Sequence, residues 1–263
     1  MTRLVAVPND TEGRDTGVLD AIGAAFATHA EVLHRSEDAD HHRAVFFLAG
    51  QPGRLHLALA AGAAEAAARI DLRRHDGLHP RVGALDVAPV VFLEEAQRGA
   101  AIAEALLAAD AIGAEGIPVF LYGELAGGRT RAELRKGGPA ELHPAAGAPL
   151  VAARAPLIAF NVALAPPATL ADARAIAAEI RDPGMPGVRA LGLRLERQDV
   201  VQVSTNIEDH RAVTAAAVLD AVRARAAVAG AELVAPAPEA ALAGWPADVE
   251  LRMPGSIEAL LGR

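Results

Sequence analysis

The sequence predicts an α+β protein built from two consecutive units, each with the element order β-α-β-β-α-β. Three observations support this: hydrophobic residues alternate between strand-like and helix-like spacing, the same order of elements occurs twice, and glycine and proline separate the elements. We place the domain boundary so that the two domains cover residues 1–154 and 155–263.

The first unit begins with a strand over residues 4–7 that is closed by Pro8 and Asn9. A helix over residues 15–29 follows, because Val18, Ile22 and Phe26 recur at the spacing of one helix face. The other elements expected here are strands at 31–33 and 44–48, a helix from Pro52 to about Arg69, a strand at 86–93, a helix at 94–112 and a strand at 118–122. The first six elements have the order of a ferredoxin-like unit.

The second unit begins with a strand over residues 157–164, and Asp172 is placed to cap the helix that follows it. The remaining elements expected here are strands at 188–195 and 200–204, a helix at 211–229 and a closing strand at 231–234. The order of the first unit is thereby repeated. We therefore predict two ferredoxin-like subdomains in tandem, with a ligand cleft or tunnel between them.

The composition excludes several classes of function. The chain of 263 residues contains no cysteine, which rules out disulfides, thiolate nucleophiles and cysteine-ligated metal sites. Its net charge of −8, without a basic stripe, argues against nucleic-acid binding. No apolar run approaches the roughly 20 residues of a membrane span, and the first residues do not resemble a signal peptide. We expect a soluble cytoplasmic protein.

The segment 70–87 carries the strongest functional signal, because it gathers aspartates, histidines and arginines directly before a strand. Pro80 biases His79 towards extended geometry, and an imidazole with an ordinary pKa near 6.5 can accept and return a proton at neutral pH. The alternative is a histidine in a surface turn. The neighbouring Arg73, Arg81 and Asp86 favour the functional interpretation.

The four-residue spacing of His75 and His79 would suit a metal on a helix face. Gly77 and Pro80 disfavour a helix here, and no third ligand is evident, so we predict no metal site.

Three further polar segments each have a structural and a functional interpretation. Before the strand at 44–48, Asp38 or Asp40 could orient the base or a substrate amine and Arg43 could hold a carboxylate, or the segment could be a solvated turn. The segments 8–15 and 202–206 could contact a ligand or cap the following helices. The candidate residues in these two segments are Asn9, Glu12, Arg14, Gln202 and Asn206.

The segment 136–149, rich in glycine, proline and alanine, is either a linker or a loop whose backbone approaches a flat ligand. Neither a nucleophile elbow, a phosphate-binding loop nor a dinucleotide fingerprint is present, which leaves acid–base transfer between two bound small molecules.

Taken in order, these motifs resemble the glutamate formiminotransferase family, folate-dependent enzymes of histidine breakdown, in their stand-alone bacterial type without a cyclodeaminase domain. The resemblance covers roughly residues 5 to 240, and where members often carry an aromatic after Pro8-Asn9 this chain has Asp10. The matching segments are Val7-Pro8-Asn9 with Glu12-Gly13-Arg14, Asp40-His41 with Arg43, Ile70 to Val87, Val119 to Glu124, Gly138-Pro139 with Gly147-Ala148, Ala153-Arg154, Leu157 to Leu164 and Gln202 to Asn206.

The resemblance implies transfer of a formimino group from N-formimino-L-glutamate to N5 of the co-substrate tetrahydrofolate, in a homodimer with a folate tunnel between the subdomains. It makes His79 the acid–base residue, and Asp38 and Asp40 complete the expected catalytic set. Candidates to hold the substrate carboxylates are Arg43, Arg73, Arg81 and Arg154, and Asn161 joins the expected folate contacts. The implied folate loop comprises Gly138, Pro139, Ala140, Glu141, Leu142, His143, Pro144, Ala145, Ala146 and Gly147.

Two alternatives stay open: a transferase that handles formyl groups or 5-formyltetrahydrofolate, and a catalytically silent folate-binding paralogue.

Overall fold

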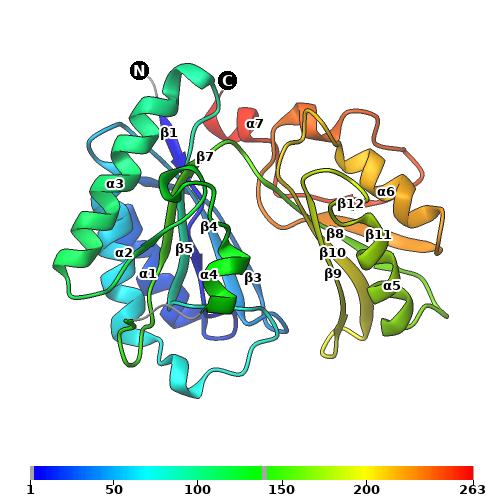
Figure 1. Cartoon of the computed structure of the whole chain (residues 1–263), viewed down its shortest axis with the longest axis horizontal. Coiled ribbons are helices and arrows are strands. Elements are labelled where there is room, and N and C mark those ends of the chain that lie inside the picture. The colour runs from blue at the N-terminus through cyan, green and yellow to red at the C-terminus, as the bar shows by residue number, and fades with distance from the viewer. Residues whose placement is uncertain (1–2, 138–140, 263) are drawn as a thin grey trace. The chain divides into compact units, whose positions relative to one another are not determined.

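The computed structural model describes residues 3–137 and 141–262, and it divides into two compact units, Met1–Ala155 and Pro156–Arg263. Each unit has its own sheet and its own hydrophobic core (Figure 1). This mixed architecture with two separate sheets confirms the α+β class.

The first unit contains one mixed sheet. Its strands follow the path β1-β4-β2-β5-β7-β6, and β3 pairs with the outer side of β4. Both β1 and β2 pair antiparallel with β4 and β5, so together they act as one interrupted central strand. The elements are β1 (Leu4–Ala6), β2 (Asn9–Asp10), α1 (Thr16–Ala27), β3 (Glu31–Asp38), β4 (Arg43–Gly50), α2 (Leu55–Arg69), β5 (Leu85–Val91), α3 (Arg98–Ala114), β6 (Phe120–Leu121), α4 (Arg131–Gly137) and β7 (Leu150–Arg154).

The two faces of the first sheet are covered differently. Helices α1, α2 and α3 lie together along one face (Figure 1). On this face Phe26 of α1 packs edge-on against Phe46 of β4. Successive strand residues point to opposite faces, so Val87 and Leu150 belong to a second, smaller cluster together with Leu134 of α4. Helix α4 therefore packs on the face that the three long helices leave open.

The second unit is a five-stranded sheet in the order β12-β11-β8-β10-β9. The apolar side chains of Phe160, Val162 and Val203 face the core formed with α5 and α6. A capping box between Thr169 and Asp172 begins α5, as expected from the sequence. The elements are β8 (Ile158–Leu164), α5 (Leu170–Ile180), β9 (Val188–Leu195), β10 (Val200–Ile207), α6 (Ala215–Arg223), β11 (Val228–Leu233), β12 (Leu251–Arg252) and α7 (Ile257–Leu261).

Several predicted boundaries were wrong. The helix expected at 211–229 is shorter, because the Thr214 hydroxyl caps α6 and residues 228–233 pair with β8 as a strand. Helix α2 begins at Leu55 rather than at Pro52. The elements α4, β7, β12 and α7 were not predicted; β7 pairs in parallel with β5, a contact between distant segments that local periodicity does not reveal.

Among the helices within residues 3–137 and 141–262, none combines the length and apolar character required to cross a membrane.

A carboxyl group lies in the core of the first unit. Asp10 of β2 is fully buried between Ala44 and Leu85, and neither carboxyl oxygen has a hydrogen-bond partner among the residues that the structure describes. Burial raises the pKa of Asp10 well above its ordinary value, because the charged form loses its hydration; Arg43 opposes this rise and Asp86 adds to it.

This buried acid predicts a pH-dependent loss of stability. The unfolded chain releases the Asp10 proton above a pKa of about 3.9, whereas the folded protein retains it. The folded state then binds more protons, so Asp10 lowers the unfolding free energy as pH rises from about 4 towards its raised folded pKa. We expect Asp10→Asn to remove this slope, measured by urea unfolding of both proteins at several pH values. Parallel pH curves for the two proteins would contradict the assignment.

Candidate active site

The centre of the site is the carboxylate of Asp86, which is fully buried at the start of β5. It accepts hydrogen bonds from the backbone N–H of Val82 (2.7 Å), from Nη1 of Arg43 (2.7 Å) and from Nη2 of Arg135 (2.6 Å). Burial alone would raise the pKa of Asp86, but the two guanidinium groups hold it far below its usual range. Asp86 is therefore a permanent buried anion shared by two cations.

Arg43 connects this carboxylate to the predicted base. It is the first residue of β4, and its Nε donates to Oδ1 of Asn9 at 3.0 Å. Its Nη1 donates to the carboxylate of Asp86 and also lies 3.2 Å from Nδ1 of His79. The structure thus brings Asn9, Arg43 and His79 together, three residues that the sequence predicted for the site.

The ring of His79 has two neighbours at the same nitrogen. Nδ1 lies 2.7 Å from the carbonyl oxygen of Pro80 and 3.2 Å from the Arg43 guanidinium. A carbonyl only accepts and a guanidinium only donates, so one tautomer cannot satisfy both contacts. The shorter contact favours a proton on Nδ1, which leaves Nε2 with a lone pair. Burial and the positive charge of Arg43 lower the pKa of His79 to about 2, so the ring is neutral at pH 7.

We expect His79 to stay neutral across the range in which an ordinary histidine, with a pKa of about 6.5, becomes charged. The measurement is a pH titration of the imidazole nitrogens by NMR, with His79→Gln used to identify the signal. Arg43→Gln should move the His79 midpoint upward, because it removes the neighbouring positive charge. A midpoint near 6.5 in the unaltered protein would contradict this environment.

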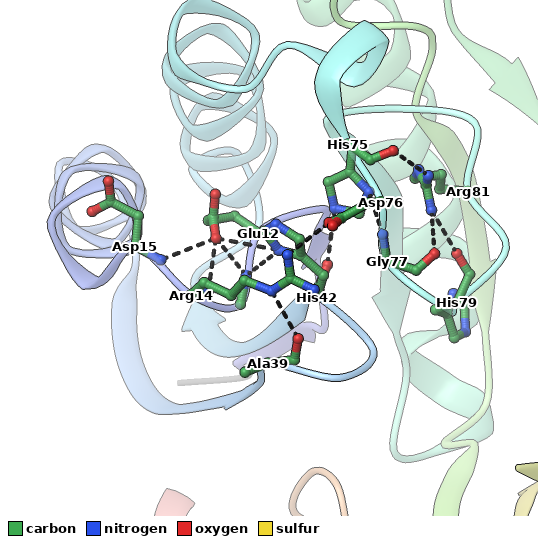
Figure 2. A network of polar contacts seen from close by, with 11 residues as sticks. Glu12, Arg14, Asp15, Ala39, His42, His75, Asp76, Gly77, His79 and Arg81 are labelled. Carbon is green, nitrogen blue, oxygen red and sulfur yellow. Dashed lines mark hydrogen bonds and ion pairs between the residues drawn. The ribbon is translucent and has the colours of Figure 1, made fainter. Parts of the chain in front are cut away.

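A second polar network braces the loop that carries His79 (Figure 2). The Glu12 carboxylate accepts from three successive backbone N–H groups, at Gly13, Arg14 and Asp15. Arg14 in turn donates to the carbonyl of Ala39 (2.9 Å) and pairs with Asp76 (2.6 Å). Glu12 thereby fixes the turn before α1, and Arg14 connects this turn to the two loops that carry Ala39 and Asp76.

Arg81 holds the same loop from inside. Its guanidinium donates to the carbonyl oxygens of His75 (2.9 Å), Gly77 (2.9 Å) and His79 (3.2 Å), as Figure 2 shows. The rings of His42 and His75 contact each other, with centroids 4.1 Å apart and planes tilted by 33°. Burial and the charge of Arg81 lower the pKa of His75 to about 4, so this ring is neutral at pH 7. In this structure Arg81 shapes the loop through backbone carbonyls.

The two aspartates predicted as catalytic have other neighbours. Asp38 accepts from the backbone N–H of His41 (2.7 Å) and lies 3.0 Å from Nδ1 of the same residue. The ring of His41 is 6.4 Å from that of His79, centroid to centroid. Asp40 is buried, and its carbonyl accepts from the N–H of Leu78. Asp38 thus orients His41 directly, and the role predicted for both aspartates remains a prediction.

Of the other arginines expected to bind carboxylates, Arg73 has an exposed side chain that pairs with Asp71. Arg154 lies at the end of β7, where its Nη1 donates to the carbonyl of Ala155.

The predicted folate loop is described from Glu141 onward; Gly138, Pro139 and Ala140 lie outside the described residues. Glu141, Leu142 and Pro144 are exposed. The loop then docks on the segment that carries His79: the carbonyls of Ala145 and Ala146 accept from the N–H groups of Leu72 and Ala84, both at 2.8 Å.

The end of this loop requires glycine. Gly147 has φ +65°, and a Cβ there would lie 1.9 Å from the carbonyl oxygen of Val82. Nδ1 of His143 accepts from the N–H of Ala146 at 2.9 Å, which closes the turn that precedes Gly147.

The second unit has a cavity of about 310 Å³ on the open face of its sheet. Asn161 and Gln202, both predicted site residues, are buried and line it, whereas Asn206 does not appear among the lining residues. Asn161 donates to the Glu232 carboxylate at 3.0 Å. The amide nitrogen of Gln202 has no hydrogen-bond partner among the described residues.

Comparison of the sequence with known proteins identifies its family. Residues 3–154 match the family model described as formiminotransferase domain, N-terminal subdomain. The chain belongs to the formiminotransferase family. This confirms the family resemblance of the ordered sequence motifs.

Three relatives within this family show how far the similarity extends. The chain is 33% identical to the formimidoyltransferase-cyclodeaminase of Rattus norvegicus, covering 92% of this chain and 51% of the relative. It thus spans about half the length of that relative. It is 34% identical to the glutamate formimidoyltransferase of Streptococcus pyogenes serotype M1, covering 79% of this chain and 78% of the relative, and 31% identical to that of Thermoplasma acidophilum, covering 92% and 90%.

The family resemblance identified neither Arg135 nor Arg131, both in helix α4, as a site residue. The available signal was the spacing of Arg131, Leu134 and Arg135, which places all three on one face of a helix.

Residues 3–137 and 141–262 contain no group of three or more histidine, aspartate or glutamate side chains that could hold a metal ion.

Proposed function

We propose that this chain transfers the formimino group from N-formimino-L-glutamate to N5 of tetrahydrofolate, giving 5-formiminotetrahydrofolate and L-glutamate. The observation that carries the proposal is the neutral His79 ring, held by the Pro80 carbonyl with Nε2 able to accept a proton. Family membership and the names of the bacterial and archaeal relatives support the same reaction class.

In the proposed reaction, His79 accepts the proton that N5 loses as N5 bonds to the formimino carbon. His79 then returns that proton to the glutamate nitrogen as the bond between this nitrogen and the formimino carbon breaks. The proton balance closes within one turnover. Acid–base assistance of this kind contributes typically about 10²- to 10⁴-fold in rate.

The low pKa of His79 in the free protein has a consequence for this step. Arg43 and Arg135 depress the pKa by their positive charge. A substrate carboxylate beside these guanidinium groups would offset that charge and raise the pKa of His79. Binding of an anionic substrate would then strengthen the base at the moment when it is needed.

The finer architecture is also part of the proposal. The strand orders β3-β4-β1/β2-β5 in the first unit and β9-β10-β8-β11 in the second support two ferredoxin-like subdomains of the formiminotransferase kind. In this proposal Asn161 and Gln202 contact folate. The folate cleft, the homodimer and the cytoplasmic location stay predictions of the resemblance.

The test is incubation of the purified protein with tetrahydrofolate and formiminoglutamate, with mass spectrometry of the folate product and His79→Ala as the inactive control. Formylglutamate and 5-formyltetrahydrofolate are tested in parallel. Turnover of a formyl substrate alone would replace the formimino assignment, and tight folate binding without any turnover would indicate a silent paralogue.

A further inference from the structure

More positive than negative charge gathers on the α4 face of the first sheet. Arg43 and Arg135 share the single carboxylate of Asp86. The half-buried Arg131 makes neither an ion pair nor a hydrogen bond with any residue that the structure describes. Burial lowers the pKa of Arg43, and although Asp86 opposes this, the charges of Arg135 and Arg131 lower it further, as expected for neighbouring cations.

The face of α4 that carries these arginines is turned towards the sheet. Leu134, between the two arginines in sequence, is 3% exposed and packs with Val87, Tyr122 and Leu150. Arg131, Leu134 and Arg135 share one helix face because they are three and four residues apart. Both guanidinium groups therefore approach the sheet surface on which Asp86 lies.

Three side-chain donors without a hydrogen-bond partner among the described residues lie close to Leu134, in α4 and at the end of β6. The Arg131 guanidinium carbon lies 5.8 Å from the centre of the Tyr122 ring. The Tyr122 hydroxyl and the Nε of Arg135 are both buried, and neither has a hydrogen-bond partner among the described residues. Buried donors are normally satisfied, so this group of donors is suited to a ligand that supplies the acceptor.

The chemistry of the donors defines that acceptor. A guanidinium binds a carboxylate through two parallel hydrogen bonds, and a phenol hydroxyl can donate a third. An excess of cations selects an anion over a neutral acceptor. Arg73 and Arg81, expected from the sequence to bind carboxylates, instead contact Asp71 and loop carbonyls.

We propose that Arg131, Tyr122 and the Nε of Arg135 form a carboxylate-binding site, which takes a carboxylate of the glutamyl donor. The identity of the donor rests on the proposed function; the site for a carboxylate rests on the unpartnered donors. Its position beside Asp86 and Arg43 places the bound anion in the charge network that also contains His79.

Binding without turnover tests the site directly. Glutarate serves as the probe and its diamide as the uncharged control, with binding to the full chain followed by NMR. Arg131→Ala should weaken glutarate binding roughly 10- to 100-fold, the effect of losing a charge-assisted pair of hydrogen bonds. Lys136→Ala removes the same charge from the exposed part of the same helix and should leave binding unchanged. Equal weakening in both variants, or none in Arg131→Ala, would overturn the proposal.

Two conservative variants keep the test decisive if Arg131→Ala does not fold. Arg131→Lys retains the charge without the planar fork, and Tyr122→Phe retains the ring beneath Arg131 without the hydroxyl. Each should weaken glutarate binding, by less than Arg131→Ala would. Unchanged binding in both would refute the site.

Kinetics separate this site from the proposed reaction. In an active enzyme, Arg131→Ala should raise KM for formiminoglutamate and leave KM for tetrahydrofolate unchanged. If the unaltered protein turns over formiminoglutamate and the variant has the same KM, the site is wrong and the function stands. If no one-carbon donor reacts but glutarate binds through Arg131, the function is wrong and the site stands.

Discussion

His79→Gln is expected to lower kcat roughly 10²- to 10⁴-fold, with little change in KM for either substrate. The ring contacts the protein through Nδ1, so in the proposed reaction Nε2 is the atom that exchanges a proton with the reacting groups. An interaction made mainly in the transition state changes kcat and not ground-state binding. The measurement is steady-state kinetics with formiminoglutamate and tetrahydrofolate, each varied at saturating concentrations of the other.

The matched control is His34→Gln, because His34 is a half-buried histidine of β3 in the same unit and outside the Asp86 network. We expect it to retain the kcat of the unaltered enzyme. Circular dichroism of both variants checks that the fold is intact. If His79→Gln kept full activity, the acid–base role would have to move to another group.

The second large effect is expected from Asp86→Asn, on stability. The side chain of Asp86 is completely buried and that of Arg43 nearly so, with relative exposures of 0% and 10%. Removing the carboxylate charge leaves two guanidinium groups without a counter-charge, and breaking a buried pair in this way costs about 3–5 kcal/mol. We expect the unfolding free energy to fall towards the lower end of this range, because Arg135 is partly exposed and can turn towards water. Urea unfolding measures the change.

Two comparisons isolate the cause. Asp71→Asn removes the charge of a half-buried aspartate that pairs with the exposed Arg73, and we expect little change in stability, because ion pairs at the surface contribute little. The double variant Asp86→Asn/Arg135→Met should recover part of the loss, because it removes one of the two unpaired cations. An Asp86→Asn protein as stable as the unaltered one would show that the network is not held by this charge.

Asp86 and Asp10 have opposite effects on the pH dependence of stability. The folded pKa of Asp86 is depressed, so its contribution is present above the unfolded pKa of about 3.9 and is lost as pH falls towards the folded value. The contribution of Asp10 is largest in acid and declines as pH rises. Single variants at each position separate the two effects.

The sequence predicted most helices and strands because their signals are local. The spacing of Val18, Ile22 and Phe26 marked α1, and the pair Thr169 and Asp172 marked the start of α5. The helix at 211–229 was overextended because alanine-rich periodicity does not distinguish a helix from the strand that follows it. The strand β7 was missed because only its pairing with β5 and β6 defines it.

By itself, the sequence determined the family and the α+β class, and it led to the proposal of a catalytic role for the His79 loop, because ordered motifs and hydrophobic spacing are properties of neighbouring residues. Only the tertiary structure decided which charged side chains contact one another. Asp86 finds Arg43 and Arg135 across separations of 43 and 49 residues, and Arg81 binds loop carbonyls although its charge suggested a substrate anion. Partners of this kind depend on which strands pair and on which face of the sheet α4 packs, and neither is encoded in local spacing.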